Sequence, residues 1–209
     1  MRTFILSIFL SLFFMGCGEN STFSDPINTD KETIDPMPFD GAVILDENLK
    51  ADYLRAINNA RSVSHDCGMN QDTGEVYGVM PAVGSLIWND MLYKSSYEHS
   101  LDLAESDTFS HTGSGTSSDW TAAALDLTAG SSVQDRIENN GYLNWITIGE
   151  NISAGTNQDL AQEAVNAWLA SPPHCANLMN PVYKDVGMGH VVVFESLFTH
   201  YWTQNFGAK

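Results

Sequence analysis

The chain opens on a short apolar run that follows a single basic residue. Arg2 is the only charge before residue 17, and residues 4–15 are predominantly apolar. This layout predicts a secretory signal peptide over residues 1–16. The run is too short for a comfortable transmembrane helix, which needs roughly 20 apolar residues.

A cysteine and a polar stretch follow the apolar run. Gly16 precedes Cys17, the arrangement at which a bacterial lipoprotein signal is cleaved and the cysteine acylated. The alternative is an ordinary signal peptide in which Cys17 has no special role. We expect Cys17 to be lipidated and residues 17–45 to form a flexible tether, because so few large apolar residues cannot bury enough surface to fold. Membrane contact is then expected only through this anchor.

The folded domain is expected over residues 46–209. Its first helix begins near Asp46, and charged residues occupy the face opposite an apolar stripe. The stripe consists of Leu49, Tyr53, Ile57 and Ala60.

Caps, breakers and apolar runs predict the later elements. Asn89 is a good N-cap, Gly141 can end a helix in the left-handed conformation, and Pro172 with Pro173 should end another helix. Helices are therefore expected over residues 91–106, 132–141 and about 160–170. Strands are expected over residues 145–151, 186–194 and 200–206. Between the second and third helices, residues 108–130 are expected to form a loop with at most one helical turn.

The order of these elements indicates the fold class. Helices come first and a strand pair comes last, which favours an α+β domain with an antiparallel sheet over a parallel one. Without its first 16 residues the chain would have 193 residues (209 − 16), enough for one domain with its own core.

The remaining two cysteines form an even pair in a chain that a signal peptide would send to an oxidising compartment. A disulfide between Cys67 and Cys175 is favoured, and it would close a loop of 108 residues (175 − 67). Two buried thiols or a shared metal site remain the alternatives.

The charge balance excludes one class of partner. The chain has 9 Lys and Arg against 26 Asp and Glu, a formal net charge of −17. Nucleic acid is therefore a poor partner, because binding phosphates requires basic side chains.

Four segments, in order, resemble the CAP superfamily: the cysteine-rich secretory, antigen 5 and pathogenesis-related proteins and their bacterial relatives, also called SCP domains. They are residues 86–92, 109–111, 149–152 and 168–178. Residues 58–61, 136–137, 141–142 and 201–207 match the bacterial branch better than the eukaryotic one. The resemblance covers roughly residues 50 to 207 and implies a three-layer α-β-α sandwich with a central antiparallel sheet.

The resemblance also implies a cleft that gathers two histidines and two acidic residues. His111, Glu150 and His174 stand at three of these positions. Ser171 stands where eukaryotic members carry the second carboxylate, so paired-carboxylate acid/base chemistry is not available from these positions. Asn177 is expected to support the cleft by hydrogen bonding.

Two imidazoles and a carboxylate suit zinc, with a fourth position left to water. We therefore expect His111 and His174 as candidate zinc ligands, with Glu150 orienting a water or one imidazole. Purely structural roles remain possible, in which Glu150 fixes its turn and His174 its loop. The other histidines, at positions 65, 99, 190 and 200, have no motif around them and are expected to be ordinary polar or packed residues.

The resemblance, together with these residues, implies a binding module in the bacterial cell envelope, or secreted from the cell, that recognises a small ligand, a glycan or a protein at the surface. One alternative is a metal-dependent hydrolase of peptide or cell-wall material with Glu150 as candidate base. Another is a lipid-binding carrier. The sequence contains neither a G-x-S-x-G nor an H-E-x-x-H motif, so a serine hydrolase or zincin mechanism is not expected.

Overall fold

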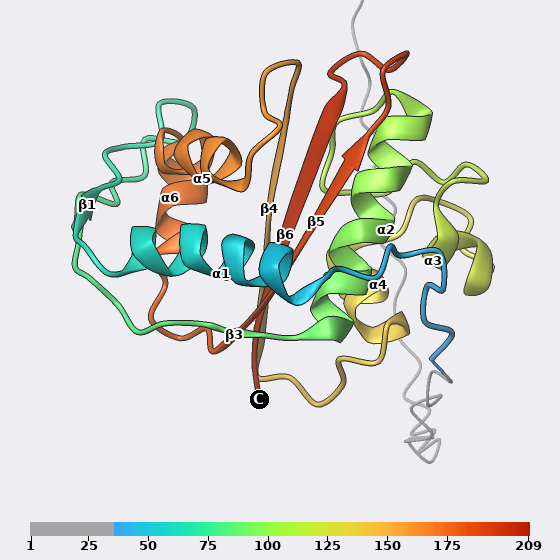
Figure 1. Ribbon diagram of the computed structural model, residues 1–209, viewed down its shortest axis with the longest axis horizontal. Coiled ribbons are helices and arrows are strands. Elements are labelled where there is room, and N and C mark those ends of the chain that lie inside the picture. Colours follow the sequence, from blue (N-terminus) through green and yellow to red (C-terminus); the bar gives the residue numbers. More distant parts are fainter. Residues whose placement is uncertain (1–35) are drawn as a thin grey trace, which may run out of the picture. The chain divides into compact units, whose positions relative to one another are not determined.

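The computed structural model describes residues 36–209, which form one α+β domain (Figure 1). Its main helices are α1 (Glu47–Arg61), α2 (Asp90–Ser106), α4 (Val133–Asn139), α5 (Ala161–Leu169) and α6 (Pro172–Leu178), with a single turn of helix at α3 (Trp120–Ala124). Its long strands are β4 (Thr147–Gly155), β5 (Asp185–Val192) and β6 (His200–Ala208), and its two-residue strands are β1 (His65–Asp66), β2 (Val79–Met80) and β3 (Ile87–Trp88).

The main sheet has the strand order β3-β5-β6-β4. The three long strands pair antiparallel, as the sequence predicted, whereas the short edge strand β3 pairs parallel to β5. The strand β4 forms the other edge. The sheet is therefore antiparallel at its centre and mixed only at β3.

Helices cover both faces of this sheet (Figure 1). The helix α2 contacts β5 and β6 on one face, while α5 and α6 contact β4 from the other side and α1 packs on α5. The expected α-β-α sandwich is confirmed.

Two glycines let α2 lie directly on the sheet. A Cβ at Gly187 would overlap the backbone of Tyr93, and one at Gly189 would overlap the backbone of Tyr97. Hydroxyl groups fill the close contact, since Ser96 Oγ donates to the Gly187 carbonyl at 3.1 Å. The sequence left the buried stripe of α2 ambiguous because this face is rich in small and polar residues.

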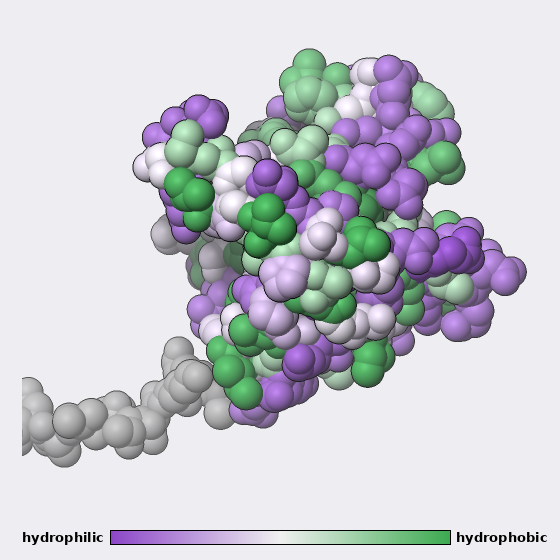
Figure 2. Space-filling view, turned by 90° about the vertical axis from the view of Figure 1, so that its left-hand side faces the viewer, coloured by the Kyte–Doolittle hydropathy of each residue, from purple (hydrophilic) through white to green (hydrophobic). Residues whose placement is uncertain are grey.

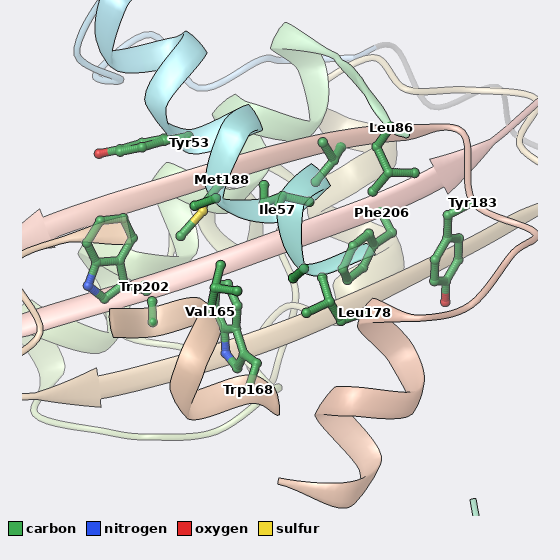
Figure 3. Close-up of a cluster of buried hydrophobic side chains, with 14 residues drawn as sticks. Tyr53, Ile57, Leu86, Val165, Trp168, Leu178, Tyr183, Met188, Trp202 and Phe206 are labelled. Atoms are coloured by element: carbon green, nitrogen blue, oxygen red, sulfur yellow. The ribbon is translucent and has the colours of Figure 1, made fainter. Parts of the chain in front are cut away.

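The apolar core lies on the opposite face, between the sheet and α1, α5 and α6 (Figure 3). The predicted face of α1 is buried at Tyr53, Ile57 and Ala60, while Leu49 is exposed. Trp168 and Trp202 are the largest side chains that are fully buried. Figure 2 shows hydrophilic and hydrophobic residues interleaved over one face of the molecule. Exposed apolar side chains scattered in this way are normal on a protein surface.

The segment before α1 is part of the domain's packing. Phe39 is buried and contacts Trp120 edge to face, with ring centroids 5.7 Å apart. The backbone N–H groups of Met37 and Phe39 donate to the side chains of Asn139 and Asn140. Residues 36–45, which the sequence pattern assigned to the tether, are therefore part of the domain. The buried Phe39 ring and the two hydrogen bonds to asparagine side chains hold this segment.

The two prolines that were expected only to end a helix also begin one. The helix α5 ends at Leu169 as predicted, and α6 then starts at Pro172. Proline suits the first turn of a helix because its missing N–H is not needed there. The sequence analysis missed α6 for this reason, although α6 carries His174.

The predicted signal peptide and Cys17 lie outside the described residues. Within residues 36–209, none of the helices has both the length and the apolar character needed to cross a membrane.

Candidate functional site

A cleft lies beside the edge strand β4, where the helical layers from the two faces of the sheet meet. Its cavity of about 430 Å³ is lined by residues of β4 and α6 and by the loops that carry Tyr77 and His111. His111, Glu150, His174 and Asn177 all line it, so the structure brings together four of the five residues that the sequence assigned to the cleft. Ser171 is the N-cap residue just before α6 and is not among the lining residues.

Glu150 lies under His111 and holds it. The carboxylate is almost fully buried, and its Oε1 accepts a hydrogen bond from His111 Nδ1 at 2.9 Å. Arg136, on α4, donates to both carboxylate oxygens at 3.2 and 2.9 Å and also to the His111 carbonyl at 3.0 Å. One buried ion pair therefore fixes both the side chain and the backbone of His111.

These contacts keep Glu150 charged. Burial by itself would raise the pKa of this carboxyl, but the positive charge of Arg136 and the neighbouring imidazoles of His99 and His111 lower it to about 2. A carboxylate with so low a pKa binds a proton poorly. The contacts of Glu150 thus favour orienting His111 over acting as a general base.

His99, on α2, completes the support behind the cleft. Its buried Nε2 donates to the Ser110 carbonyl at 2.9 Å, just before His111, and lies 3.7 Å from Glu150 Oε1. Burial and the charge of Arg136 lower the pKa of His99 to about 4, so the ring is neutral near pH 7. Its Nδ1 is buried without a hydrogen-bond partner in the described part of the chain.

His174 is placed by a second set of hydrogen bonds on the other side of β4. Asn151 donates through Nδ2 to the His174 carbonyl at 3.2 Å, and Asn177 donates to Asn151 Oδ1 at 3.0 Å and to the Glu150 carbonyl at 3.1 Å. Asn177 thus supports the cleft by tying α6 to β4.

The two cleft histidines face each other across the opening. Their ring centroids are 6.2 Å apart and the rings are inclined by 59°. The side chain of His111 is 50% exposed, which leaves its Nε2 available to a ligand once Nδ1 is bound to Glu150. Burial and the neighbouring His111 lower the pKa of His174, which favours the neutral ring.

The predicted disulfide is confirmed. Cys67 is bonded to Cys175 on α6, with their Cα atoms 5.4 Å apart, across 108 residues of chain. The bond ties the loop that contains Tyr77, a cleft-lining residue, to the helix that contains His174.

A second cavity of about 590 Å³ lies on the other side of His111. It shares His111 and Glu150 with the first cavity and adds residues 132–134 at the start of α4 and 148–149 of β4. His111 therefore separates two open hollows along the sheet edge, and a ligand in either one contacts it.

The residues around the cleft do not form a preformed cage for a metal. Within residues 36–209, no group of three or more His, Cys, Asp or Glu side chains could hold an ion. The reason is that both oxygens of Glu150 face Arg136 and His111, which leaves the two imidazoles as the protein's donors.

Sequence reasoning missed the supporting residues. Arg136 and Asn151 lay within matched segments but were given no role at the cleft, and His99 was expected to be an ordinary residue. A buried arginine on one helix and a buried histidine on another carry no sequence signal of a shared carboxylate. Only the fold brings α2, α4 and β4 together at Glu150.

The α-β-α sandwich with two histidines facing each other at the sheet edge is the arrangement expected of a CAP domain. Comparison with known families identifies the same family. The model of the CAP, or cysteine-rich secretory protein, family matches residues 53–206. The chain belongs to this family, as the sequence motifs indicated.

Individual relatives match parts of the chain. The uncharacterized protein YkwD of Bacillus subtilis is 39% identical over 67 residues, which cover 32% of this chain and 23% of YkwD. An outer surface protein of Borrelia burgdorferi is 20% identical with a TM-score of 0.53, over 83% of this chain and 99% of the Borrelia protein. An extracellular SCP-domain protein of Bacillus anthracis is 26% identical with a TM-score of 0.45, over 61% of this chain and 35% of that protein. The chain therefore corresponds to about a quarter of YkwD and a third of the B. anthracis protein.

Proposed function

We propose that this protein is a binding module of the cell envelope that takes a polar ligand, such as a glycan or a peptide group, in the cleft between His111 and His174. One observation carries the proposal: a buried Arg136–Glu150 ion pair fixes the His111 imidazole while half of that side chain faces the cleft. A buried ion pair is costly to desolvate. Its location directly beneath an exposed imidazole is explained if the imidazole must be held in one orientation for a ligand.

A weakly held divalent ion, zinc in the first instance, is part of this proposal. Neutral imidazoles are zinc ligands, and a carboxylate that binds the second nitrogen of a ligating histidine orients it, as Glu150 does for His111. Since the protein supplies two donors, the remaining coordination positions would fall to water or to the ligand. A bound zinc ion would polarise a carbonyl or carboxylate group of the ligand.

The contacts of Glu150 count against the hydrolase alternative. A base must accept a proton, and Glu150 is held as a charged carboxylate by Arg136 and His111. The side chains of His111, His174 and Asn177 in the cleft lining can also hydrogen-bond to a polar ligand, which an acyl chain could not use.

Calorimetric titration with zinc at pH 7.5 tests the metal part of the proposal. The native protein should bind zinc, and both His111→Ala and His174→Ala should remove the cleft ion and so lower the number of zinc ions bound per chain by one, whereas His65→Ala should not. Affinity should fall steeply below about pH 6, because a protonated imidazole cannot ligate a metal. Equal binding by all four proteins would place any metal elsewhere and refute the proposed site.

The envelope location rests on the sequence and on the relatives. Two of the similar proteins are an extracellular and an outer surface protein, and we extend this location to the present chain. Replacing Cys17 with serine should move the protein from the membrane fraction to the soluble fraction. If native protein and variant are both soluble, the lipid anchor is wrong and the protein is secreted without one.

A further inference from the structure

A second pair of histidines lies on the sheet, outside the cleft residues. His190 is on β5 and His200 begins β6, and the strand register pairs His190 with Trp202 and His200 with Val192. The two histidines are therefore diagonal neighbours on one face of an antiparallel pair, close enough for long side chains to meet. Their ring nitrogens do meet, since His190 Nε2 lies 3.1 Å from His200 Nδ1.

We propose that His190 and His200 form a binding site for a divalent transition-metal ion that prefers imidazole, such as Cu²⁺ or Zn²⁺. Two nitrogens bound to one tetrahedral zinc at the usual bond length are about 3.3 Å apart. The observed separation differs from this by only a few tenths of an ångström. The distance between the two nitrogens therefore suits one ion. The ring centroids are 5.3 Å apart and the planes are inclined by 11°, so the rings would have to turn for both lone pairs to point at that ion.

The position of one ligand is fixed in advance. The His190 ring stacks on the Trp202 indole, with centroids 3.7 Å apart and planes inclined by 4°. Trp202 is itself fully buried at one end of the core cluster (Figure 3), and its Nε1 donates to the Gln158 carbonyl at 2.7 Å. A ring held on a buried indole loses little freedom when it binds an ion, which raises affinity.

Both rings remain partly exposed, so an ion can reach them. Burial and the neighbouring His200 lower the pKa of His190 to about 4, whereas Asp159 acts in the opposite direction. His190 is therefore neutral at pH 7 and keeps a lone pair for an ion. The nearby carboxylate of Asp159 and the large negative charge of the chain would attract a cation.

Binding requires a small proton rearrangement. In the free protein one of the two facing nitrogens donates a hydrogen bond to the other. When an ion binds, the donating ring moves its proton to its other nitrogen, so that both facing nitrogens present lone pairs and no net proton is released. The imidazole pair follows the general preference of nitrogen donors, with Cu²⁺ bound more tightly than Zn²⁺.

The experiment is a Cu²⁺ titration of the full-length protein carrying His111→Ala and His174→Ala, which removes the cleft histidines. We expect one ion to bind and to quench tryptophan fluorescence through its contact with His190, next to Trp202. Adding His200→Gln, which keeps a hydrogen-bonding side chain, should weaken binding by more than about tenfold, since even outer-shell partners of metal ligands are worth that much. Adding His65→Gln instead is the matched control and should leave binding unchanged.

A measurement without this variant guards against a fold defect. Paramagnetic Cu²⁺ added in small amounts to the protein with both cleft histidines replaced should broaden the ring signals of His190 and His200 before those of His65. Failure of that protein to bind Cu²⁺, unchanged affinity after His200→Gln, or broadening that spares His190 and His200 would each overturn the proposal. None of these results bears on zinc at His111 and His174, so the two sites are tested separately.

Discussion

Glu150 and Asn151 are neighbours in β4, and their side chains hold the two halves of the cleft from opposite faces of the sheet. Glu150 binds His111 and Arg136, whereas Asn151 binds the backbone of His174 and the side chain of Asn177. Because successive residues of a strand point to opposite faces, one dipeptide can order residues from both helical layers. The edge position of β4 then lets the two imidazoles meet.

Arg136→Met should destabilise the protein by about 3–5 kcal/mol, because it leaves the Glu150 carboxylate buried without its counter-charge. The loss should shrink on acidification, as burial then favours the protonated carboxyl. Urea unfolding monitored by circular dichroism measures both effects. Arg55→Met is the matched control: Arg55 pairs with Asp52 on the exposed side of α1, where an ion pair is worth at most about 1 kcal/mol. Equal losses in the two variants would contradict the role given to Arg136.

The unfolding free energy of the native protein should fall as the pH drops from 6.5 to 4, because the pKa of His99 is lower in the folded state than in the unfolded state. The pKa of His99 is lowered from 6.5 to about 4, so over this range the unfolded state binds a proton that the folded state does not bind. The stabilisation that His99 provides is complete above pH 6.5 and amounts to at most about 3 kcal/mol.

Glu98 makes the unfolding free energy change with pH in the opposite direction. Burial raises its pKa to about 7, so its contribution is full below pH 4.5 and is lost as the pH rises through 7. The His99 contribution is therefore isolated by the difference between native protein and His99→Gln in urea unfolding from pH 4 to 8, with His65→Gln as control. A difference that does not change with pH would refute the assignment.

Removing the disulfide with Cys67→Ser and Cys175→Ser should cost about 2–5 kcal/mol of unfolding free energy. It should also weaken zinc binding at the cleft, because α6, which carries His174, loses its link to the Tyr77 loop. Chemical denaturation and zinc calorimetry measure the two effects. Thiol counting on the unfolded, unreduced native protein provides the check: free thiols at positions 67 and 175 would show that the bond does not form in solution.

Gly187→Ala should lower the unfolding free energy by about 2 kcal/mol or more, since its methyl group would overlap the backbone of α2 at Tyr93. Gly84→Ala is the matched control, because a Cβ there meets nothing within 4 Å. Thermal unfolding of the two variants gives the comparison. A similar melting temperature for both would mean that α2 can shift away from the sheet at little cost.

The sequence by itself determined most of the long helices and strands and the family. Asn89 marked the start of α2, Gly141 the end of α4, and alternating or apolar runs the strands β4, β5 and β6, because caps and hydrophobic periodicity act over a few neighbouring residues. The ordered motifs named three cleft residues, and the even pair of cysteines in a chain with a predicted signal peptide indicated the disulfide. The start of α6 at Pro172 was missed, since a proline that ends one helix can also begin the next.

Only the tertiary structure decided which groups act on one another. Arg136, His99 and Glu150 lie on α4, α2 and β4, and nothing in their spacing tells that one carboxylate faces both. The distance between His190 and His200 depends on the register of β5 and β6, which a shift of one residue would move to opposite faces. Burial then set the protonation of these groups, because the cost of a charge depends on what surrounds it in three dimensions and not on its neighbours in the chain.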